Sequence, residues 1–397
     1  MKNLSKILSC TFWTLCLIVL STFLLSCNKE MDDTEPVLEL VKFERLSNLV
    51  WGRADVGRFG KFDDRLYYSN INNPGYFDED GRQNQFAFRS FDMRFGHVFS
   101  EQFTVGVESN RRSLIIIPNI DYSSSNTVFL NARNIPELST EFLLKPGWSE
   151  IPNFALNENF LISAWEKPWY SENPNQRENV FILELNAREN GMGENGQVID
   201  RNEPVINKIS IDYQIEGFSM EDLISVFPFE DGWIASANIA GLQPSFFIEK
   251  NGNVSPLFND LRRFVIFGLQ TSESGELFVS NEGGFYYSPS GSPFTLNQIA
   301  TANVDLRFRL IGDRIIVWVG MDKLYELKNY RDTSEISLVE LENSGLEGLL
   351  IKDVELFQEK FYVSTNGGLF LKDQEDFWTE KELSSDPTLD IGWEFVR

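Results

Sequence analysis

The chain has 397 residues, of which 42% are hydrophobic, 24% are charged and 34 are phenylalanine. This composition is typical of a folded protein with a large apolar core, and it excludes an intrinsically disordered chain. The formal net charge of −24 would repel phosphates over most of the surface, so we expect no nucleic-acid partner.

The first 26 residues have the features of an export signal. Lys2 and Lys6 precede an uncharged apolar stretch at 7–25, which runs into Ser26 and Cys27. A basic start, an apolar centre and a small residue before the cleavage point together predict secretion. The apolar stretch is just long enough to cross a bilayer, so an uncleaved N-terminal anchor is the alternative.

The sequence Leu24-Leu25-Ser26-Cys27 resembles the lipobox of bacterial lipoproteins. The resemblance implies that residues 1–26 are removed and that Cys27 is lipidated, which would attach the protein to a membrane. Residues 27–36 are short and charged, and we expect a flexible tether. Their acids resemble the export tags of surface lipoproteins in Bacteroidetes-type bacteria, which implies a surface-exposed outer-membrane lipoprotein. A periplasm-facing location is the alternative.

Removal of the signal would leave Cys27 as the only cysteine, because Cys10 and Cys16 lie within the signal. The mature chain could then form no internal disulfide, even in an oxidising compartment.

Two stretches in the second half of the chain nearly repeat each other. Residues 276–287 read Glu-Leu-Phe-Val-Ser-Asn-Glu-Gly-Gly-Phe-Tyr-Tyr, and residues 360–371 read Lys-Phe-Tyr-Val-Ser-Thr-Asn-Gly-Gly-Leu-Phe-Leu. Each predicts a strand, a tight turn and a second strand, because β-branched and aromatic residues flank paired glycines that allow positive φ.

Seven places in the chain fit this template. The paired strands are 66–69 with 86–88, 114–117 with 128–130, 161–164 with 180–183, 233–236 with 246–248, 277–280 with 285–287, 315–318 with 324–327, and 361–364 with 369–371. Apart from one interval of 72 residues, the pairs begin 38 to 48 residues apart, which is the period of propeller blades. We therefore predict an all-β fold, a seven-bladed β-propeller over residues 37–397, with eight blades as the alternative.

The 72-residue interval is explained without an eighth blade. Residues 186–197 are rich in Gly, Asn and Glu and predict a long hairpin loop inside blade 3, with residues 208–213 as the outer strand of that blade. Residues 37–43 and 391–396 are the two chain ends available to close the ring.

Residues 279–287, and residues 363–370 with the following Trp378, resemble propeller repeats of periplasmic sensor domains in hybrid two-component regulators and of BNR-type proteins. The resemblance implies the fold alone. Ser364-x-Asn366-x-Gly368 is similar to an Asp-box, a motif that usually forms a structural turn, and we interpret it so here.

No catalytic, phosphate-binding or metal-binding motif is found, so we expect a protein that is not an enzyme and that has no cofactor or metal. The single histidine, His97, lies in a strand-like sequence, and we expect a structural role for it. Asp78-Glu79-Asp80-Gly81 lacks the spacing of a calcium loop and predicts an exposed turn, with weak cation binding as the alternative.

One predicted loop concentrates aromatic residues, namely Trp165, Trp169 and Tyr170. Aromatic side chains on a proline-stiffened loop could stack on a sugar ring or on a partner protein, so these three are the candidate binding residues. The alternative is that Trp165 and Trp169 fold back to cover the edge of the blade.

These features together predict a lipoprotein that binds or scaffolds a protein or glycan partner without catalysis. The alternative is a glycan-degrading hydrolase or lyase with acidic residues in the propeller funnel. Two funnel carboxylates about 5–10 Å apart would favour glycoside hydrolysis, whereas a funnel filled by Phe and Tyr would favour binding. The sequence predicts neither the ligand nor the oligomeric state.

Overall fold

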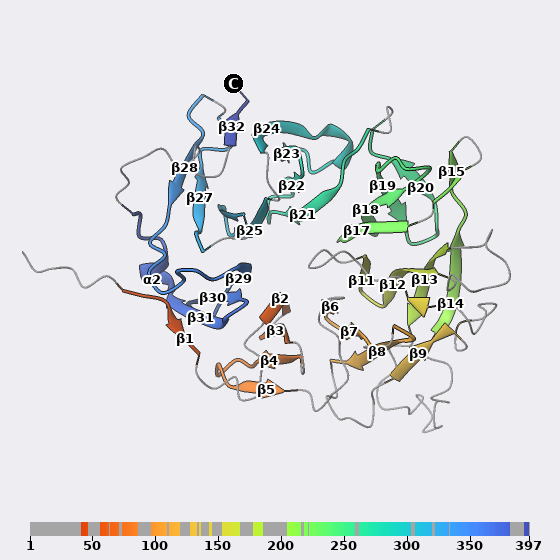
Figure 1. The fold of residues 1–397 in the computed structure, drawn as a ribbon, viewed down its shortest axis with the longest axis horizontal. Helices are drawn as coiled ribbons and strands as arrows, with labels where there is room; N and C mark the ends of the chain where they lie inside the picture. Colours follow the sequence, from red (N-terminus) through yellow and green to blue (C-terminus); the bar gives the residue numbers. More distant parts are fainter. Residues whose placement is uncertain are drawn as a thin grey trace, which may run out of the picture. The chain divides into compact units, whose positions relative to one another are not determined.

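The computed structural model describes the chain from residue 41 onward, with gaps. The described residues are 41–46, 56–62, 64–70, 74–85, 97–108, 111–119, 128–132, 135, 143–144, 153–166, 178–185, 205–215, 218–220, 222–258, 262–302, 306–319, 322–332, 334–381 and 393–396. Their strands form seven antiparallel sheets arranged as the blades of a β-propeller (Figure 1). The predicted signal and tether lie outside the described residues.

The first four blades follow one another along the chain. Blade 1 consists of β2 (Val56–Phe62), β3 (Arg65–Asn70), β4 (Gly75–Phe77) and β5 (Gln83–Gln85). Blade 2 consists of β6 (His97–Phe99), β7 (Phe103–Val107), β8 (Ser113–Pro118) and β9 (Val128–Asn131). Blade 3 consists of β10 (Leu143–Leu144), β11 (Phe154–Asn157), β12 (Phe160–Glu166), β13 (Glu178–Leu185) and β14 (Val205–Ile211), with β10 and β11 both paired to β12. A short hairpin of β15 (Gln214–Ile215) and β16 (Phe218–Ser219) leads to blade 4, which consists of β17 (Asp222–Phe229), β18 (Gly232–Asn238), β19 (Ser245–Glu249) and β20 (Val254–Pro256).

The last three blades repeat the pattern, and each begins with its innermost strand. Blade 5 consists of β21 (Ile266–Thr271), β22 (Leu277–Asn281), β23 (Gly284–Ser288) and β24 (Asn297–Ala302), with the 3-10 turn η5 (Pro293–Thr295) before β24. Blade 6 consists of β25 (Arg307–Ile311), β26 (Arg314–Trp318), β27 (Tyr325–Lys328) and β28 (Ser337–Glu340). Blade 7 consists of β29 (Ile351–Phe357), β30 (Lys360–Thr365) and β31 (Gly368–Asp373), followed by the one-turn helix α2 (Gln374–Phe377).

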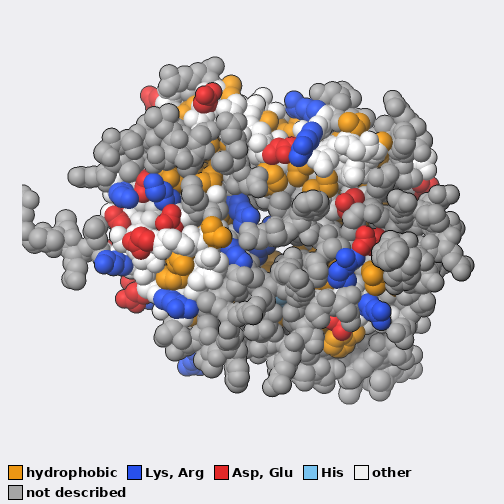
Figure 2. All heavy atoms as spheres, viewed as in Figure 1, with side chains coloured by type: hydrophobic (Ala, Val, Ile, Leu, Met, Phe, Trp, Pro, Cys, Tyr) orange, Lys and Arg blue, Asp and Glu red, His pale blue; other side chains and the backbone are white. Residues whose placement is uncertain are grey.

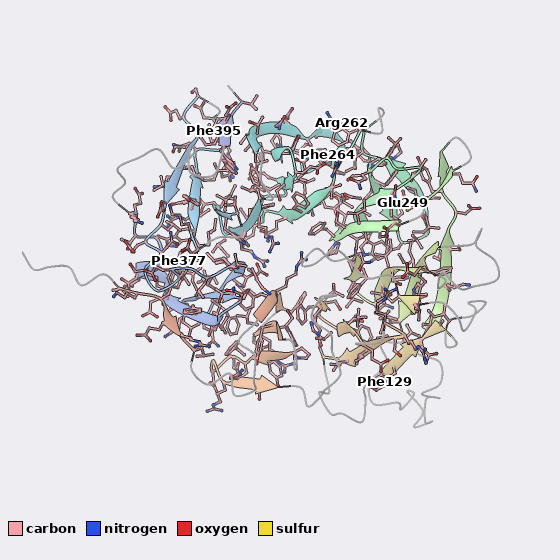
Figure 3. All side chains as sticks on the ribbon, in the orientation of Figure 1. Phe129, Glu249, Arg262, Phe264, Phe377 and Phe395 are labelled. Atoms are coloured by element: carbon pink, nitrogen blue, oxygen red, sulfur yellow. The ribbon has the colours of Figure 1, made fainter. Side chains whose placement is uncertain are left out.

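Both ends of the propeller chain add a strand to a blade. Near the N-terminal end, β1 (Glu44–Arg45) pairs antiparallel with β31 and supplies the outer strand of blade 7. This pairing closes the ring, because blade 7 otherwise has only three strands. At the C-terminal end, β32 (Trp393–Phe395) pairs with β24 as a fifth strand of blade 5, where Phe395 lies at the periphery in Figure 3.

The seven-blade prediction is confirmed, and three details of it are corrected. Strand 66–69 pairs with Gly75–Phe77, because the chain already returns as a strand at Gly75; residues 86–88, the predicted partner, lie outside the described residues. Strand 114–117 belongs to β8, the third strand of blade 2, since β7 precedes it. The outer strand of blade 3 is Val205–Ile211, a few residues earlier than predicted.

The hydrophobic core is divided among the junctions between blades. The described residues form seven buried clusters, and each cluster joins two neighbouring blades. The core is divided in this way because side chains alternate between the two faces of each strand. In β30, Phe361 and Val363 pack toward blade 6, whereas Tyr362 between them packs toward blade 1. Every middle strand must therefore be apolar on both faces, which explains the continuous apolar runs in the sequence.

The serine that ends several second strands has a specific role. In blades 1, 4, 5 and 7 the innermost strand shifts register against the second strand, so that its backbone is locally unpaired. Ser236 compensates at the junction with blade 5, where its hydroxyl accepts from the Ile266 N–H at 3.0 Å and donates to the Phe264 carbonyl at 3.1 Å. Ser69 accepts from the Arg58 N–H at 2.9 Å in the same way.

The glycine pairs form the tight turns that their sequence predicts. Gly284 and Gly368 have φ of 150° and 129°, and a Cβ on Gly284 would lie 2.1 Å from the Ala300 carbonyl oxygen. In the second turn the Gly367 N–H donates to Thr365 Oγ1 at 3.0 Å, and Asn366 Oδ1 accepts from the Leu350 N–H at 2.9 Å. Asn366 thus joins this turn to the backbone before β29, so the Asp-box-like residues have a structural role, as expected.

A charged cluster ties blade 5 to blade 6. Arg331 donates to both carboxylate oxygens of Glu276, with Nε at 2.9 Å from Oε1 and Nη2 at 2.6 Å from Oε2, and the Tyr287 hydroxyl donates to Oε1 at 2.5 Å. The hydrogen bond from Arg331 is the largest influence on the pKa of the Glu276 carboxyl group, and burial opposes it; the pKa of Glu276 falls to about 2.

Within the described residues no helix is long and apolar enough to span a membrane.

We expect Glu276→Gln to destabilise the propeller by roughly 1.5–3 kcal/mol at neutral pH, because it removes the ionised partner of charge-assisted hydrogen bonds. The pKa of Glu276 is lower in the folded state than its ordinary 4.5, so its stabilisation is complete above pH 4.5 and is lost as the pH falls toward 2. The melting-temperature difference between variant and wild type should therefore shrink over this interval. Glu273→Gln, at an exposed neighbouring acid, is the matched control. A difference that stays constant down to pH 2 would contradict the assignment.

Candidate functional site

A cavity of about 380 Å³ lies at the centre of the propeller and is lined by the innermost strand of every blade. These strands are β2, β6, β11, β17, β21, β25 and β29, which surround the middle of the ring in Figure 1. The volume is within the range of about 300–1,000 Å³ that small-molecule sites occupy. We call this cavity the central channel and take it as the candidate functional site.

The charged residues of the channel come from three consecutive blades, namely blades 6, 7 and 1. Five are basic and two are acidic, and they are Arg307, Arg309, Lys352, Asp353, Glu355, Arg58 and Lys61. In the space-filling view, Lys and Arg side chains gather beside a hollow at the middle of the face (Figure 2). An excess of positive charge therefore lines one side of the channel in a protein whose net charge is −24.

Among the described residues, the remaining four blades line the channel with side chains that carry no charge. They contribute His97, Val98, Phe99, Ala155, Leu156, Val226, Phe227, Pro228, Phe267, Gly268, Leu269 and Gln270. The channel is thus amphipathic, with charged groups on blades 6, 7 and 1 and a predominantly apolar wall on blades 2 to 5.

Both channel carboxylates lie against one guanidinium group. Arg309 Nη2 is 2.6 Å from Asp353 Oδ1, and Arg309 Nη1 is 3.3 Å from Glu355 Oε2. Residues two apart on a strand share a face, which is how β29 presents Asp353 and Glu355 together. Burial alone would lower the pKa of Arg309, but the charges of Asp353 and Glu355 outweigh it and raise that pKa above its ordinary value.

The two carboxyl groups differ in their surroundings. Asp353 Oδ2 accepts from the Phe59 N–H of blade 1 at 2.8 Å, and its Oδ1 accepts from the Val354 N–H at 2.9 Å as well as from Arg309. Burial raises the pKa of Glu355, and the charge of Arg309 opposes this rise. Asp353 therefore joins blades 6, 7 and 1, whereas Glu355 has fewer hydrogen bonds to its charged form.

His97 contributes to the channel wall as a neutral group. Its side chain is buried at the start of β6, and burial lowers its pKa to about 3. At neutral pH the imidazole is uncharged, and it adds no positive charge to the channel. The expected structural role agrees with this buried position.

Of the three aromatic residues predicted to bind a ligand, only Trp165 lies within the described residues. Trp165 is fully buried near the end of β12, where its indole N–H donates to Ser163 Oγ at 2.9 Å. The prediction that it is a loop residue available to a ligand is wrong, because the strand runs to Glu166 and buries the indole in the cluster between blades 2 and 3. Trp169, Tyr170 and Cys27 lie outside the described residues, so their assigned roles stay predictions.

The predicted acidic turn is confirmed as a turn. Asp78 Oδ1 accepts from the Arg82 N–H at 2.8 Å and from the Asp80 N–H at 3.1 Å, and Gly81 has a φ of 70°. Across the part of the chain that the structure describes, no group of three or more His, Cys, Asp or Glu residues has the geometry to hold a metal ion.

Apart from His97, the channel residues were not predicted from the sequence. A signal existed, because two innermost strands place charged residues among apolar ones: β25 reads Arg-Phe-Arg-Leu-Ile and β29 reads Ile-Lys-Asp-Val-Glu-Leu-Phe. Only the arrangement of the blades, however, brings these two strands next to Arg58 and Lys61.

We expect Asp353→Asn to lower the stability by about 3 kcal/mol, because it keeps the side-chain volume but leaves the buried Arg309 with one carboxylate partner. Thermal or urea unfolding measures the loss. Asp231→Asn is the control, since the Asp231 side chain is fully exposed and its substitution should change stability by less than about 0.5 kcal/mol. Equal effects of the two substitutions would show that the contact between blades 6, 7 and 1 contributes nothing.

Neither a protein-family model nor a curated protein sequence matches the chain. Solved structures do resemble it. They include the extracellular domain described as part of a hybrid two-component system of B. thetaiotaomicron (TM-score 0.50, 11% identity, 83% of this chain and 39% of that one). The chain thus spans about two fifths of that relative's length. Virginiamycin B lyase from Staphylococcus aureus (0.50, 10%, 83% and 97%) and AztD from Citrobacter koseri (0.50, 9%, 85% and 88%) are also similar. At these identities the similarity establishes the propeller fold.

Proposed function

We propose that this chain is an exported lipoprotein whose propeller binds a partner and does not transform it. The observation that carries the proposal is the use of the two channel carboxylates, Asp353 and Glu355. Both lie on the Arg309 guanidinium, and Asp353 also accepts two backbone N–H groups. A general base or nucleophile needs a lone pair directed at the substrate, and the hydrogen bonds of Asp353 instead serve the junction of the blades.

A glycan-degrading activity is the second candidate, and the presence of two carboxyl groups in the channel, on Asp353 and Glu355, favours it in the way expected from the sequence. Acid catalysis of glycoside cleavage uses a carboxyl group that stays protonated near neutral pH beside one that is ionised. Burial raises the pKa of Glu355, and the neighbouring Asp353 carboxyl accepts from the Phe59 N–H. Arg309 counts against this candidate, because a cation between the two carboxyl groups opposes protonation of Glu355 and would repel an oxocarbenium-like transition state.

The location of the protein completes the proposal. Cys27 would carry the lipid, residues 27–36 would act as a tether, and the propeller would stand clear of the outer membrane, on the cell surface. Trp169 and Tyr170 are proposed contacts for a protein or glycan partner, and the central channel is proposed for a small ligand.

We expect purified protein spanning residues 27–397 to release no products from bacterial or host polysaccharides, as measured by the appearance of reducing ends or of unsaturated sugars. The same protein, carrying an affinity tag and extracted in its lipidated form from the native membrane, should capture a partner in a constant ratio to itself. Glu355→Gln is the control, since the wild type and this variant should give the same background. Turnover by the wild type that Glu355→Gln abolishes would overturn the binding proposal in favour of hydrolysis or elimination.

We expect Cys27→Ala to accumulate as a precursor without lipid, because acylation requires the thiol of that residue. Metabolic labelling with palmitate and fractionation of membranes measure the change. Ser26→Ala, which keeps a small residue before the cysteine, should be processed and labelled like the wild type. Normal processing and labelling of Cys27→Ala would show that the lipobox assignment is wrong.

A further inference from the structure

We propose that the central channel binds a small organic anion that has an apolar face. The anionic group would lie toward blades 6, 7 and 1, and the apolar face would lie against blades 2 to 5. The inference rests on the proposed binding function and adds the chemical class of the ligand.

The charge of the lining is the first argument. Among the described residues of the lining, five are basic and two are acidic, a difference of three positive charges. Arg58, Arg307 and Lys352 also interact with other groups of the protein, and this difference does not depend on which of them are paired. An anion entering the channel therefore meets a positive potential.

The enclosure of the channel strengthens this effect. Attraction between charges increases as the effective dielectric constant falls from that of water toward that of a protein interior. Arg309 has only 19% of its side chain exposed, and Arg58, Arg307 and Lys352 are half-buried. A carboxylate, phosphate or sulfate group among these side chains would therefore gain more electrostatic binding free energy than it would at the open surface.

The uncharged wall selects the rest of the ligand. Phe99, Phe267 and Leu269 line the channel and are each only half-buried, so their side chains keep surface that a ligand could cover. Burial of apolar surface contributes about 25 cal/mol per Å². A fully hydrated inorganic anion would gain no binding free energy from this wall. An organic anion with a ring or a short aliphatic body would gain it both from the apolar wall and from the charged side of the channel.

The dimensions of the channel limit the size of the ligand. Its volume of about 380 Å³ is at the lower end of the range for small-molecule sites. All seven blades contribute to the wall, so the channel cannot widen without separation of the packed junctions between blades. The ligand is accordingly one small molecule, or one end of a longer one.

The experiment compares two probes that differ in charge and share an apolar body. Naphthalene-2-carboxylate and naphthalene-2-methanol are titrated into residues 27–397, and binding is followed by calorimetry and by saturation-transfer NMR. We expect the carboxylate to bind with a dissociation constant at least tenfold lower, with one molecule bound per chain. Inorganic phosphate should bind more weakly than the carboxylate, because it lacks the apolar body.

Variants then locate the binding. Lys61→Gln combined with Arg307→Gln removes two positive charges from opposite sides of blade 7 and should abolish the preference for the carboxylate. Arg263→Gln, at a side chain outside the channel that is 64% exposed and paired with Glu282, should leave both affinities unchanged. If the double variant fails to fold, Lys61→Gln alone, at an exposed side chain of the channel, should still reduce the preference for the carboxylate.

Equal affinity for the two probes would overturn the anion preference and leave the binding function intact. If the preference for the carboxylate survives in the double variant but is lost when charged residues elsewhere on the surface are substituted, the site lies outside the channel and the proposal is overturned. Absence of binding by either probe would also overturn it. Failure of the binding function itself would appear separately, as turnover in the polysaccharide assay.

Discussion

The structure depends on the contact that Asp353 makes across the place where the ring closes. Its carboxylate accepts from the backbone of blade 1 through Phe59 and from Arg309 of blade 6, so one side chain joins three blades. The other junctions combine apolar clusters, which are not directional, with local polar contacts such as that of Arg331 with Glu276 between blades 5 and 6. The last blade is assembled from the two ends of the propeller, since β1 supplies its outer strand, and a directional contact there fixes how blade 7 meets blade 1. A buried ion pair contributes little to net stability but can specify one relative position of the groups that it joins. At the closure of the ring, the relative position of blades 7 and 1 has to be specified in this way.

The same contact determines the chemistry of the channel. Closing the ring with charged groups places Arg309, Asp353 and Glu355 at the axis, where an apolar lining would otherwise be expected. Desolvation of these groups is unfavourable, and their mutual pairing offsets it. Arg309 is shared by two carboxylates, so one cation balances both of them. The contacts that close the ring therefore also determine which charges face the channel.

The fold could be predicted from the sequence to the extent that it repeats. The Ser that ends several apolar strands and the Gly-Gly turns are local requirements, met by Ser236 at a blade junction and by Gly284 and Gly368 at hairpins, so they leave a periodic pattern. Blade 2 lacks that pattern and blade 1 has the Ser without the Gly-Gly turn, and both were assigned less well. The channel could not be predicted, since Phe59 and Asp353 are 294 residues apart and meet only when the ring closes. Trp165 was misassigned for a related reason: its neighbours in sequence suggest a loop, and only the strand pairing shows that it is buried.

The contrast between the exterior and the channel limits which anions reach the site. A chain with a net charge of −24 repels an extended polyanion along its whole length, because many of its charges approach the acidic surface at once. A small anion carries one or two charges, and at physiological ionic strength the repulsion from the exterior is screened within about 8 Å. Inside the channel it lies beside the cations of blades 6, 7 and 1. The distribution of charge thus discriminates by size as well as by sign, which is the behaviour expected of a site for a small ligand and not of a groove for a charged polymer.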